Sequence, residues 1–426
     1  MKIRTMRLGI AVSALLLAGI VYWGYHYSRD SSLHSALAAS TLQAGDLELI
    51  DGYNRFGNRL FLEAISQSEA SANRFLSPYS AAVALSMAYN GASGKTAEEM
   101  ARVLLYPSSV KENVNRSNNA ILGASIQRTE KTELQIANSI WLRKGISFKP
   151  GFLAANKSYY NSKLDTLDFA DSSAPRQIND WVKQQTNGKI DSIVDPAIGE
   201  DVISILLNAV YFNGEWSTPF YPGYTKEQPF KREDGTMAQV KMMHVGGEYA
   251  YAKTEQAEAV RLPYGDGRLG MTVYIPGKKT KALPELAEWL LGEGGLKKIS
   301  GELRMKTGSI ALPRFKLEDK LELNEILKGM GMASAFNPQQ ADFGGIAALV
   351  DGNIYLSKAM QKTYVEVNER GTEAAAVTKI EISATGAQVV DDRFQFEANR
   401  PFFFTISDQD TGLILFMGSV SDPRES

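Results

Sequence analysis

The sequence predicts an α+β fold built as one domain. Three observations support this class: apolar residues recur at helical spacing early in the chain, strand-like apolar runs dominate the later part, and strands do not alternate with helices as in parallel βαβ sheets. Residues 46–423 contain no Pro/Gly/Ser-rich linker and no internal repeat. We therefore expect a single folded body with mixed or antiparallel sheets.

Start and stop signals predict the helices. Ser77 and Pro78 provide an N-cap and a first-turn proline for a helix that ends at the Asn-Gly pair of residues 90–91. Thr96 and Glu99 have the spacing of a capping box, which would begin the next helix. Further helices are expected over residues 49–65, 150–162, 175–187, 282–291 and 319–330.

Apolar runs rich in β-branched and aromatic residues predict the strands. These runs cover residues 134–142, 202–212, 259–262, 271–275, 310–312 and 364–367. At the C-terminus, residues 402–406 and 413–420 flank the turn sequence Asp410-Thr411-Gly412. Both runs are mainly apolar on both faces, so we expect a hairpin that is buried on both faces.

The first 27 residues have the pattern of a membrane-targeting segment. Lys2, Arg4 and Arg7 precede an apolar run over residues 8–27, which at about 1.5 Å per residue nearly spans a bilayer core of about 30 Å. Basic residues before the run place the rest of the chain outside the cytoplasmic membrane, in the cell envelope or secreted. A signal peptide and an uncleaved signal-anchor both fit, and the bulky residues 21–25 favour the anchor. Residues 28–45 would then be a polar tether.

Composition excludes several classes of site. The chain has no cysteine, so disulfides, thiolate metal sites and cysteine nucleophiles are excluded. His26 and His34 precede the folded body, which leaves only His244 for a catalytic triad and rules out a metal site of several histidines. The net charge of −2 gives no reason to expect nucleic acid. We expect no enzyme, metal or cofactor, with a hydrolase as the less favoured alternative.

Residues 371–388 do not fit the pattern of a compact domain. With their flanks they form about 25 residues without turn chemistry or a strong apolar face, a length typical of functional or disordered loops. At period two, Thr372, Ala374, Ala376 and Thr378 share one face and are all small. Such a strand could enter a crowded sheet, because no large side chain has to pass its neighbours. An exposed alanine-rich helical turn fits the same residues equally well.

Several motifs resemble those of the serpins, a superfamily named for serine protease inhibitors. They are ERGTEAAA (369–376), NRFLSPYS (73–80), NAVYFNGEW (208–216), LPRFK (312–316), ADFGGI (341–346), NRPFFF (399–404) and LFMG (415–418). The resemblance, to a bacterial serpin, spans roughly residues 47–423. It implies several helices around three mixed or antiparallel β-sheets, with an exposed reactive-centre loop.

The resemblance also implies a mechanism and the residues that carry it. The catalytic serine or cysteine of a target protease would attack one peptide bond of the loop, break it and remain joined to the loop by an acyl link. The hinge would then insert into the sheet and carry the protease away. The reactive bond would be Thr385–Gly386, whose small residues suit elastase-like or subtilisin-like proteases. The hinge would be Glu369, Gly371, Thr372, Glu373, Ala374, Ala375, Ala376 and Thr378. The shutter and breach, where the sheet opens, would be Ser77, Ser80, Asn208, Gln361 and Trp216, with glutamine where the family commonly has histidine at 361.

Two functions remain open within this resemblance. The first is an inhibitor that forms a covalent acyl complex with its protease and is otherwise a monomer. The second is a non-inhibitory serpin that acts as a binding or chaperone-like protein, and such proteins often carry bulky or charged hinge residues. The small hinge residues favour the inhibitor. Residues 111–128 lack the basic cluster of a heparin-binding helix, so we expect no heparin-like cofactor.

Overall fold

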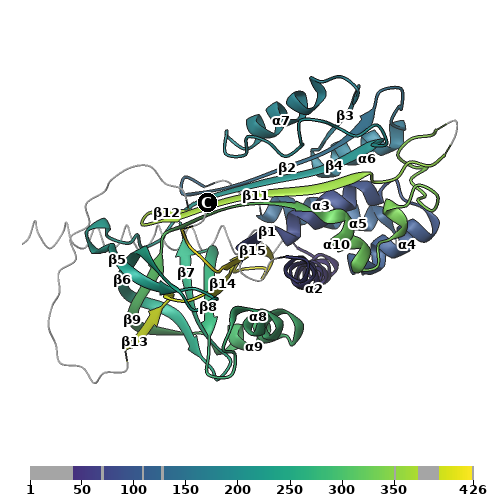
Figure 1. Cartoon of the computed structure of the whole chain (residues 1–426). Helices are drawn as coiled ribbons and strands as arrows, with labels where there is room; N and C mark the ends of the chain where they lie inside the picture. The colour runs from purple at the N-terminus through teal and green to yellow at the C-terminus, as the bar shows by residue number, and fades with distance from the viewer. Residues whose placement is uncertain are drawn as a thin grey trace, which may run out of the picture.

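The computed structural model describes residues 42–68, 72–107, 110–125, 129–349, 352–372 and 393–424. Within these ranges the strands form a six-stranded sheet and a nine-stranded sheet. Figure 1 shows the six-stranded sheet running along the length of the molecule, with the early helices grouped under one end and the nine-stranded sheet under the other. The α+β class expected from the sequence is confirmed.

The six-stranded sheet contains β12 (Gly371–Thr372), whose two residues belong to the hinge expected from the sequence. Its order is β10 (Phe315–Glu322), β11 (Lys358–Asn368), β12 (Gly371–Thr372), β4 (Ser204–Glu215), β2 (Thr132–Arg143) and β3 (Lys163–Leu167). Strands β11 and β4 are parallel and pair directly from Lys358↔Ile205 to Tyr364↔Tyr211. Beyond that point β12 lies between them and pairs antiparallel with both.

The nine-stranded sheet holds the C-terminal hairpin. Its order is β1 (Arg74–Leu76), β15 (Ile414–Val420), β14 (Phe402–Asp408), β8 (Leu269–Pro276), β7 (Ala257–Tyr264), β6 (Met237–Lys253), β9 (Arg304–Pro313) and β13 (Phe394–Glu397), with β5 (Lys226–Lys231) paired to β6. Strand β6 is 17 residues long and pairs with β5 near its start and with β7 at its end. It therefore joins strands of two sheets, so the three sheets implied by the resemblance appear as two hydrogen-bonded networks.

Helices cover both faces of the six-stranded sheet. The helices are α2 (Ala44–Ser66), α3 (Pro78–Tyr89), α4 (Gly94–Val103), α5 (Lys111–Ser125), α6 (Pro150–Tyr160), α7 (Ala174–Gln185), α8 (Leu283–Ala287), α9 (Gly295–Glu302) and α10 (Leu323–Gly329), with short turns η1 (Pro222–Tyr224), η2 (Glu288–Gly292) and η3 (Ser334–Phe336). Every residue of α3 is buried, which makes it the central helix of the main core. Helix α7 lies on the opposite face and packs Ile178 and Val182 into a second apolar cluster (Figure 1).

The N-terminal segment of residues 1–27 and most of the tether lie outside the described residues. In the described part of the chain, none of the helices has the length and hydropathy needed to cross a membrane. Helix α2 begins at Ala44, two residues before the start of the folded body expected from the sequence.

Several local signals agree with the structure. Ser77 is the N-cap of α3, where its Oγ accepts a hydrogen bond of 3.3 Å from the backbone N–H of Ser80. The C-terminal hairpin is confirmed, with Phe404 opposite Gly418 and nearly every residue of both strands buried. A Cβ at Gly418 would collide with the ring of Phe404, so this close packing depends on glycine.

The capping box expected at Thr96 and Glu99 is wrong. Helix α4 begins at Gly94, and both side chains point to another part of the chain. Thr96 Oγ1 accepts from the N–H of Asp342 at 3.0 Å, and the Glu99 carboxylate accepts from the N–H of Ser334 at 2.8 Å. These two residues therefore tie α4 to the loop that follows α10 instead of capping the helix.

The helix expected over residues 319–330 is wrong at its start. Residues 319–322 belong to β10, and α10 begins only at Leu323. Asp319 is buried, where it accepts from the N–H of Phe75 at 3.0 Å and pairs with Arg74 at 3.1 Å. Burial still raises the pKa of the Asp319 carboxyl. Helices α5 and α9 and strands β1, β3, β5, β6 and β13 were also not predicted.

Candidate functional site: the opening of the six-stranded sheet

The breach is the end of the sheet at which β11 and β4 separate. Trp216 follows β4 and is buried there, with its ring stacked on Tyr264 at a centroid distance of 4.3 Å and an interplanar angle of 12°. Its indole Nε1 donates to the carbonyl of Asn368 at 3.0 Å, and its backbone N–H donates to the carbonyl of Arg370 at 2.7 Å. Trp216 therefore holds the tight turn between β11 and β12 from two sides.

The first hinge residues lie between the two separated strands. A Cβ at Gly371 would collide with the carbonyl oxygen of Gly214, so only glycine can approach β4 this closely. Thr372 is fully buried, and its Oγ1 shares a hydrogen bond of 2.7 Å with the hydroxyl of Tyr264. The small side chain of Thr372 is thus fully enclosed, and its hydroxyl is hydrogen-bonded to Tyr264.

Glu369 anchors the turn that leads into the hinge. Its Oε1 accepts from Thr225 Oγ1 at 2.5 Å and from Arg314 Nε at 2.8 Å, and its backbone carbonyl accepts from the N–H of Phe220 at 2.7 Å. Burial by itself raises the pKa of the Glu369 carboxyl, but the hydrogen bonds from Arg314 and Thr225 outweigh it and leave the pKa lowered. The side chain is therefore ionised at neutral pH.

The shutter lies lower in the sheet, where β11 and β4 pair directly. Gln361 is fully buried, and its amide is bonded at both ends to one residue of the α3 entry: Oε1 accepts from the N–H of Ser77 at 2.9 Å and Nε2 donates to the carbonyl of Ser77 at 2.9 Å. Nε2 also donates to Oδ1 of Asn208 at 2.5 Å. A neutral amide thus supplies both the donor and the acceptor that this cluster needs.

Asn208 links this cluster to a third strand. Its Nδ2 donates to Oδ1 of Asn138 on β2 at 2.6 Å and to the hydroxyl of Ser80. The hydroxyl of Ser77 donates to the carbonyl of Leu415 on β15 at 2.6 Å. The structure therefore brings Ser77, Ser80, Asn208 and Gln361 together, and adds Asn138, which the sequence analysis did not identify. The available signal was an amide at residue 138, beside the apolar residues Ile136, Ala137 and Ile140 of the predicted strand.

Comparison with known families identifies this architecture. A family model described as Serpin (serine protease inhibitor) matches residues 51–423. The chain belongs to the serpin family.

Relatives and solved structures agree with this assignment. The chain is 34% identical over 379 residues to an uncharacterized serpin-like protein of Thermococcus kodakarensis, covering 88% of this chain and 86% of that protein. It is 33% identical over 394 residues to human leukocyte elastase inhibitor, covering 88% and 100%. The native thermophilic serpin tengpin superposes with a TM-score of 0.81 at 31% identity, covering 90% and 95%. The bacterial origin expected from the sequence stays a prediction.

Human thyroxine-binding globulin has the same fold. Its structure superposes with a TM-score of 0.81 at 25% identity, covering 90% of this chain and 100% of that chain. The serpin fold is therefore shared with a protein whose name describes the binding of thyroxine.

The sequence analysis missed a segment, residues 189–198, that crosses the outer face of the six-stranded sheet of this serpin. We call this segment the strap. The segment after α7 is held on the sheet by two lysines of neighbouring strands: Lys362 Nζ donates to the carbonyl of Ser192 at 2.7 Å, and Lys320 Nζ pairs with Asp195 at 2.7 Å. Lys362 is nearly buried and also pairs with Glu318 at 2.6 Å. A lysine within a buried strand was the available signal, because such a cation needs partners.

Part of the predicted site falls outside the described residues. The reactive bond Thr385–Gly386 lies there, as do the hinge residues Glu373, Ala374, Ala375, Ala376 and Thr378. Glu369, Gly371 and Thr372 are the hinge residues that the structure describes, and they lie at the breach as set out above.

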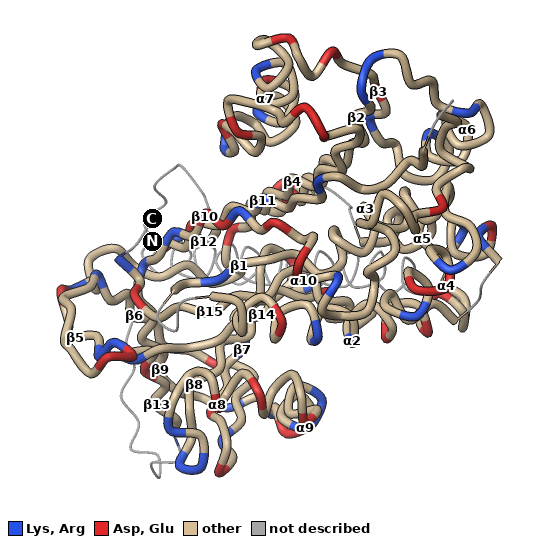
Figure 2. Tube along the Cα trace, turned by 45° about the vertical axis from the view of Figure 1, so that its right-hand side comes forward, with Lys and Arg blue, Asp and Glu red and all other residues tan. Residues whose placement is uncertain are grey.

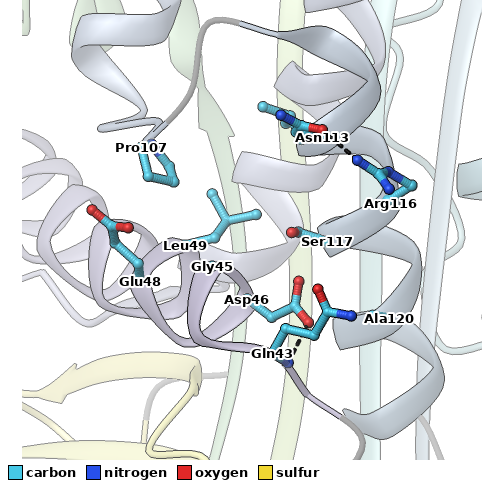
Figure 3. Close-up of a pocket in the computed structure, with 11 residues that line it drawn as sticks. Gln43, Gly45, Asp46, Glu48, Leu49, Pro107, Asn113, Arg116, Ser117 and Ala120 are labelled. Atoms are coloured by element: carbon cyan, nitrogen blue, oxygen red, sulfur yellow. Dashed lines mark hydrogen bonds between the residues drawn. The ribbon is translucent and has the colours of Figure 1, made fainter.

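A polar hollow lies away from the sheet, between the start of α2 and α5. Figure 3 shows this cavity of about 430 Å³, in which Arg116 bonds to Asn113 and Asp46 accepts from the N–H of Gln43 at 2.8 Å. Each of these bonds joins two residues three positions apart at the start of one helix, and neither crosses the hollow, so the arrangement does not indicate a particular ligand.

Charged residues are spread over the surface. Figure 2 shows lysines and arginines interspersed with aspartates and glutamates over the described elements, without one continuous basic stripe. Within the described ranges, no group of three His, Asp or Glu side chains is arranged to hold a metal ion.

Proposed function

We propose that this serpin is a suicide inhibitor of serine proteases, in which cleavage of the segment between β12 and β13 lets the hinge continue as a new strand between β11 and β4. One observation carries the proposal: Gly371 and Thr372 already pair with both strands. The next residues would follow the same path by separating β11 from β4. A strand that entered there would form an antiparallel ladder on each side in place of one parallel ladder.

The energy of such an insertion is sufficient for a mechanical trap. One ladder is lost and two are gained, so a strand of about 12 residues adds on the order of 12 hydrogen bonds at roughly 0.5–1.5 kcal/mol net each. A whole domain is stable by only about 5–15 kcal/mol. The inserted form would therefore be more stable than the resting form by an amount comparable to the stability of the fold itself, and it could distort a protease held by an acyl bond.

The proposed target is an elastase-like or subtilisin-like enzyme. The bond expected from the resemblance, Thr385–Gly386, has small side chains on both sides, which suit a shallow apolar pocket. The relationship to leukocyte elastase inhibitor supports the same class. A cysteine protease is the second class to which the same acylation chemistry extends.

The proposed location is the cell envelope outside the cytoplasmic membrane. Lys2, Arg4 and Arg7 before an apolar run support an N-terminal signal-anchor or signal peptide, followed by the tether of residues 28–45. A monomer on such a tether would meet periplasmic or extracellular proteases.

The test is a protease panel read by denaturing gels and residual activity. Elastase-like, subtilisin-like, trypsin-like and papain-like enzymes are mixed with the protein, and each product is examined for a complex that survives boiling in detergent. We expect such a complex, with loss of protease activity, for at least one enzyme of the first two classes. Cleavage of the protein by these enzymes with full recovery of protease activity would contradict inhibition.

The alternative is a non-inhibitory binding serpin, and one feature favours it. A cavity of about 360 Å³ lies between α2, the start of α8 and the end of β15, with Phe61, Leu62, Ile65 and Leu283 among its lining residues. Thyroxine-binding globulin shows that the fold is compatible with ligand binding. This function would be supported by two results together. The panel would yield no complex, and an apolar fluorescent probe would bind the wild type but not the Ile65→Arg variant.

A further inference from the structure

Two exposed tyrosines lie at the turn η1 before β5, and an exposed methionine lies at the far end of the β5–β6 hairpin. Residues 220–231 and Met237 form what we call the tyrosine band. Tyr221 is 40% exposed, Tyr224 52% and Met237 56%, although large apolar side chains of the described residues are otherwise mostly buried. Exposed aromatic residues that cluster in this way are enriched at protein interfaces.

The tyrosine band connects the two described ends of the proposed bait segment. At its start, the N–H of Phe220 donates to the carbonyl of Glu369 at 2.7 Å, and at its end the N–H of Lys231 donates to the carbonyl of Asn399 at 2.9 Å. Met237 lies opposite Lys231 in the β5–β6 register. Figure 1 shows β12, β5 and β13 at the same end of the molecule. A protein that binds the segment between Thr372 and Arg393 would therefore have this band within reach.

The aromatic side chains are held in place before any partner arrives. The Tyr221 and Tyr224 rings contact each other edge to face at 5.1 Å. A Cβ at Gly223 would lie 2.5 Å from the Tyr221 ring, so glycine allows that ring to fold back over the turn. Thr225 fixes the end of the turn through its bond to Glu369. Rigid tyrosines lose little conformational entropy on binding and present both an apolar face and a hydroxyl.

The edge of the band does not suit pairing with a strand of another chain. Among the described strands, β5 pairs with β6 alone, so its other side is a sheet edge except where the N–H of Lys231 bonds to Asn399. Pro229 cannot donate from that edge, and Lys226 and Lys231 are exposed at its two ends. Proline and lysine are the residues that block strand addition. The band therefore offers side chains to a folded partner, and a second copy paired through this edge is disfavoured.

We propose that the tyrosine band is a docking surface for the body of the target protease, which it contacts outside the active-site cleft. This rests on the proposed function, because the protease is the partner that must lie over both ends of residues 373–392. The contact would speed capture of the protease before acylation, and it would discriminate among enzymes that accept the same bait sequence.

The test compares Tyr221→Ser/Tyr224→Ser with a matched control, Leu47→Ser/Leu153→Ser, whose leucines are similarly exposed on α2 and α6. The readout is the second-order rate constant of inhibition for a protease that the panel identifies. We expect about a five- to tenfold fall for the tyrosine variant, as for interface aromatics, and less than a twofold change for the control. The variant Tyr221→Phe/Tyr224→Phe should keep most of the wild-type rate constant, because the aromatic rings remain. Equal rates for wild type and the tyrosine variant would overturn the proposal.

The design separates failure of docking from failure of inhibition. If the wild type is only cleaved, the proposed function fails, and docking is then read from kcat/KM for cleavage of the whole protein relative to a peptide of residues 373–392. A whole-protein advantage that the tyrosine variant loses supports the band, and no advantage overturns it. If the double variant lowers Tm, Tyr224→Ser alone, at the more exposed ring, is judged by the same criteria.

Discussion

The hydroxyls of Tyr264 and Thr372 lie 2.7 Å apart in a position where both residues are fully buried. Tyr264 ends β7 in the nine-stranded sheet, and Thr372 is the last described residue of the hinge in the six-stranded sheet. Trp216 stacks on the tyrosine ring from the other side and bonds to the turn before the hinge. One contact between the two sheets therefore holds Thr372 in its place between β11 and β4.

Removing this hydrogen bond should loosen the hinge without disturbing the ring packing. In Tyr264→Phe the stacking on Trp216 remains, but the Thr372 hydroxyl loses its partner. We expect the free energy of unfolding to fall by about 1–3 kcal/mol, the cost of leaving a buried polar group unpaired. Urea unfolding measures this change, and a double-mutant cycle with Thr372→Val isolates the coupling. Because Thr372→Val removes the orphaned hydroxyl, the double variant should recover part of the loss, whereas additive losses would contradict a direct bond.

A charge at position 372 should convert the inhibitor into a substrate. Thr372 has no exposed surface in the resting molecule, so Thr372→Arg would displace β12 from between β11 and β4. Returning the strand to that position would bury an unpaired cation at a cost of several kcal/mol. Insertion would then be too slow to outrun hydrolysis of the acyl bond. The ratio of detergent-stable complex to cleaved protein should fall sharply for Thr372→Arg and stay near the wild-type value for Thr372→Ser. Full inhibition by the arginine variant would contradict the insertion mechanism.

Sequence patterns predicted the elements whose signals are local. Ser77 and Pro78 mark the start of α3, and two apolar runs around a short turn mark the C-terminal hairpin. The patterns failed where a side chain has a distant partner. Thr96 and Glu99 look like a local cap but bond to residues 342 and 334.

Prediction of the site residues depended on the family resemblance, because these residues also have partners that are distant in the sequence. The shutter joins residues of α3, β2, β4 and β11, and no periodicity brings such distant segments together. The resemblance placed Gln361 beside Ser77 and Asn208, but it did not supply Asn138 or the strap held by Lys362. These contacts follow from the register of neighbouring strands, which only the structure reveals.

The ionised carboxyl of Glu369 should make the breach sensitive to acid. Because its folded-state pKa is lowered, the stability that it contributes is fully present above about pH 4.5, near its unfolded pKa, and is lost as pH falls through the folded pKa. Glu369→Gln should therefore be less stable than the wild type at pH 7, and the difference should shrink toward pH 3. Thermal unfolding across this range measures the effect. A difference between the two proteins that is independent of pH would contradict the ion pair with Arg314.

The strap after α7 should limit how easily β11 and β4 separate. Lys362 lies on β11 and bonds to the Ser192 carbonyl, so the strap is fastened to one of the two strands that a new strand must part. Lys362→Met keeps the length and burial of the side chain but removes the donor, which should free the strap locally. We expect faster hydrogen exchange over residues 189–198 and a faster insertion step, at the cost of about 1–3 kcal/mol of resting stability. Lys320→Met is the comparison, because its pair with Asp195 is more exposed and should contribute less. Unchanged exchange in Lys362→Met would show that apolar packing of the segment, and not this lysine, holds the strap on the sheet.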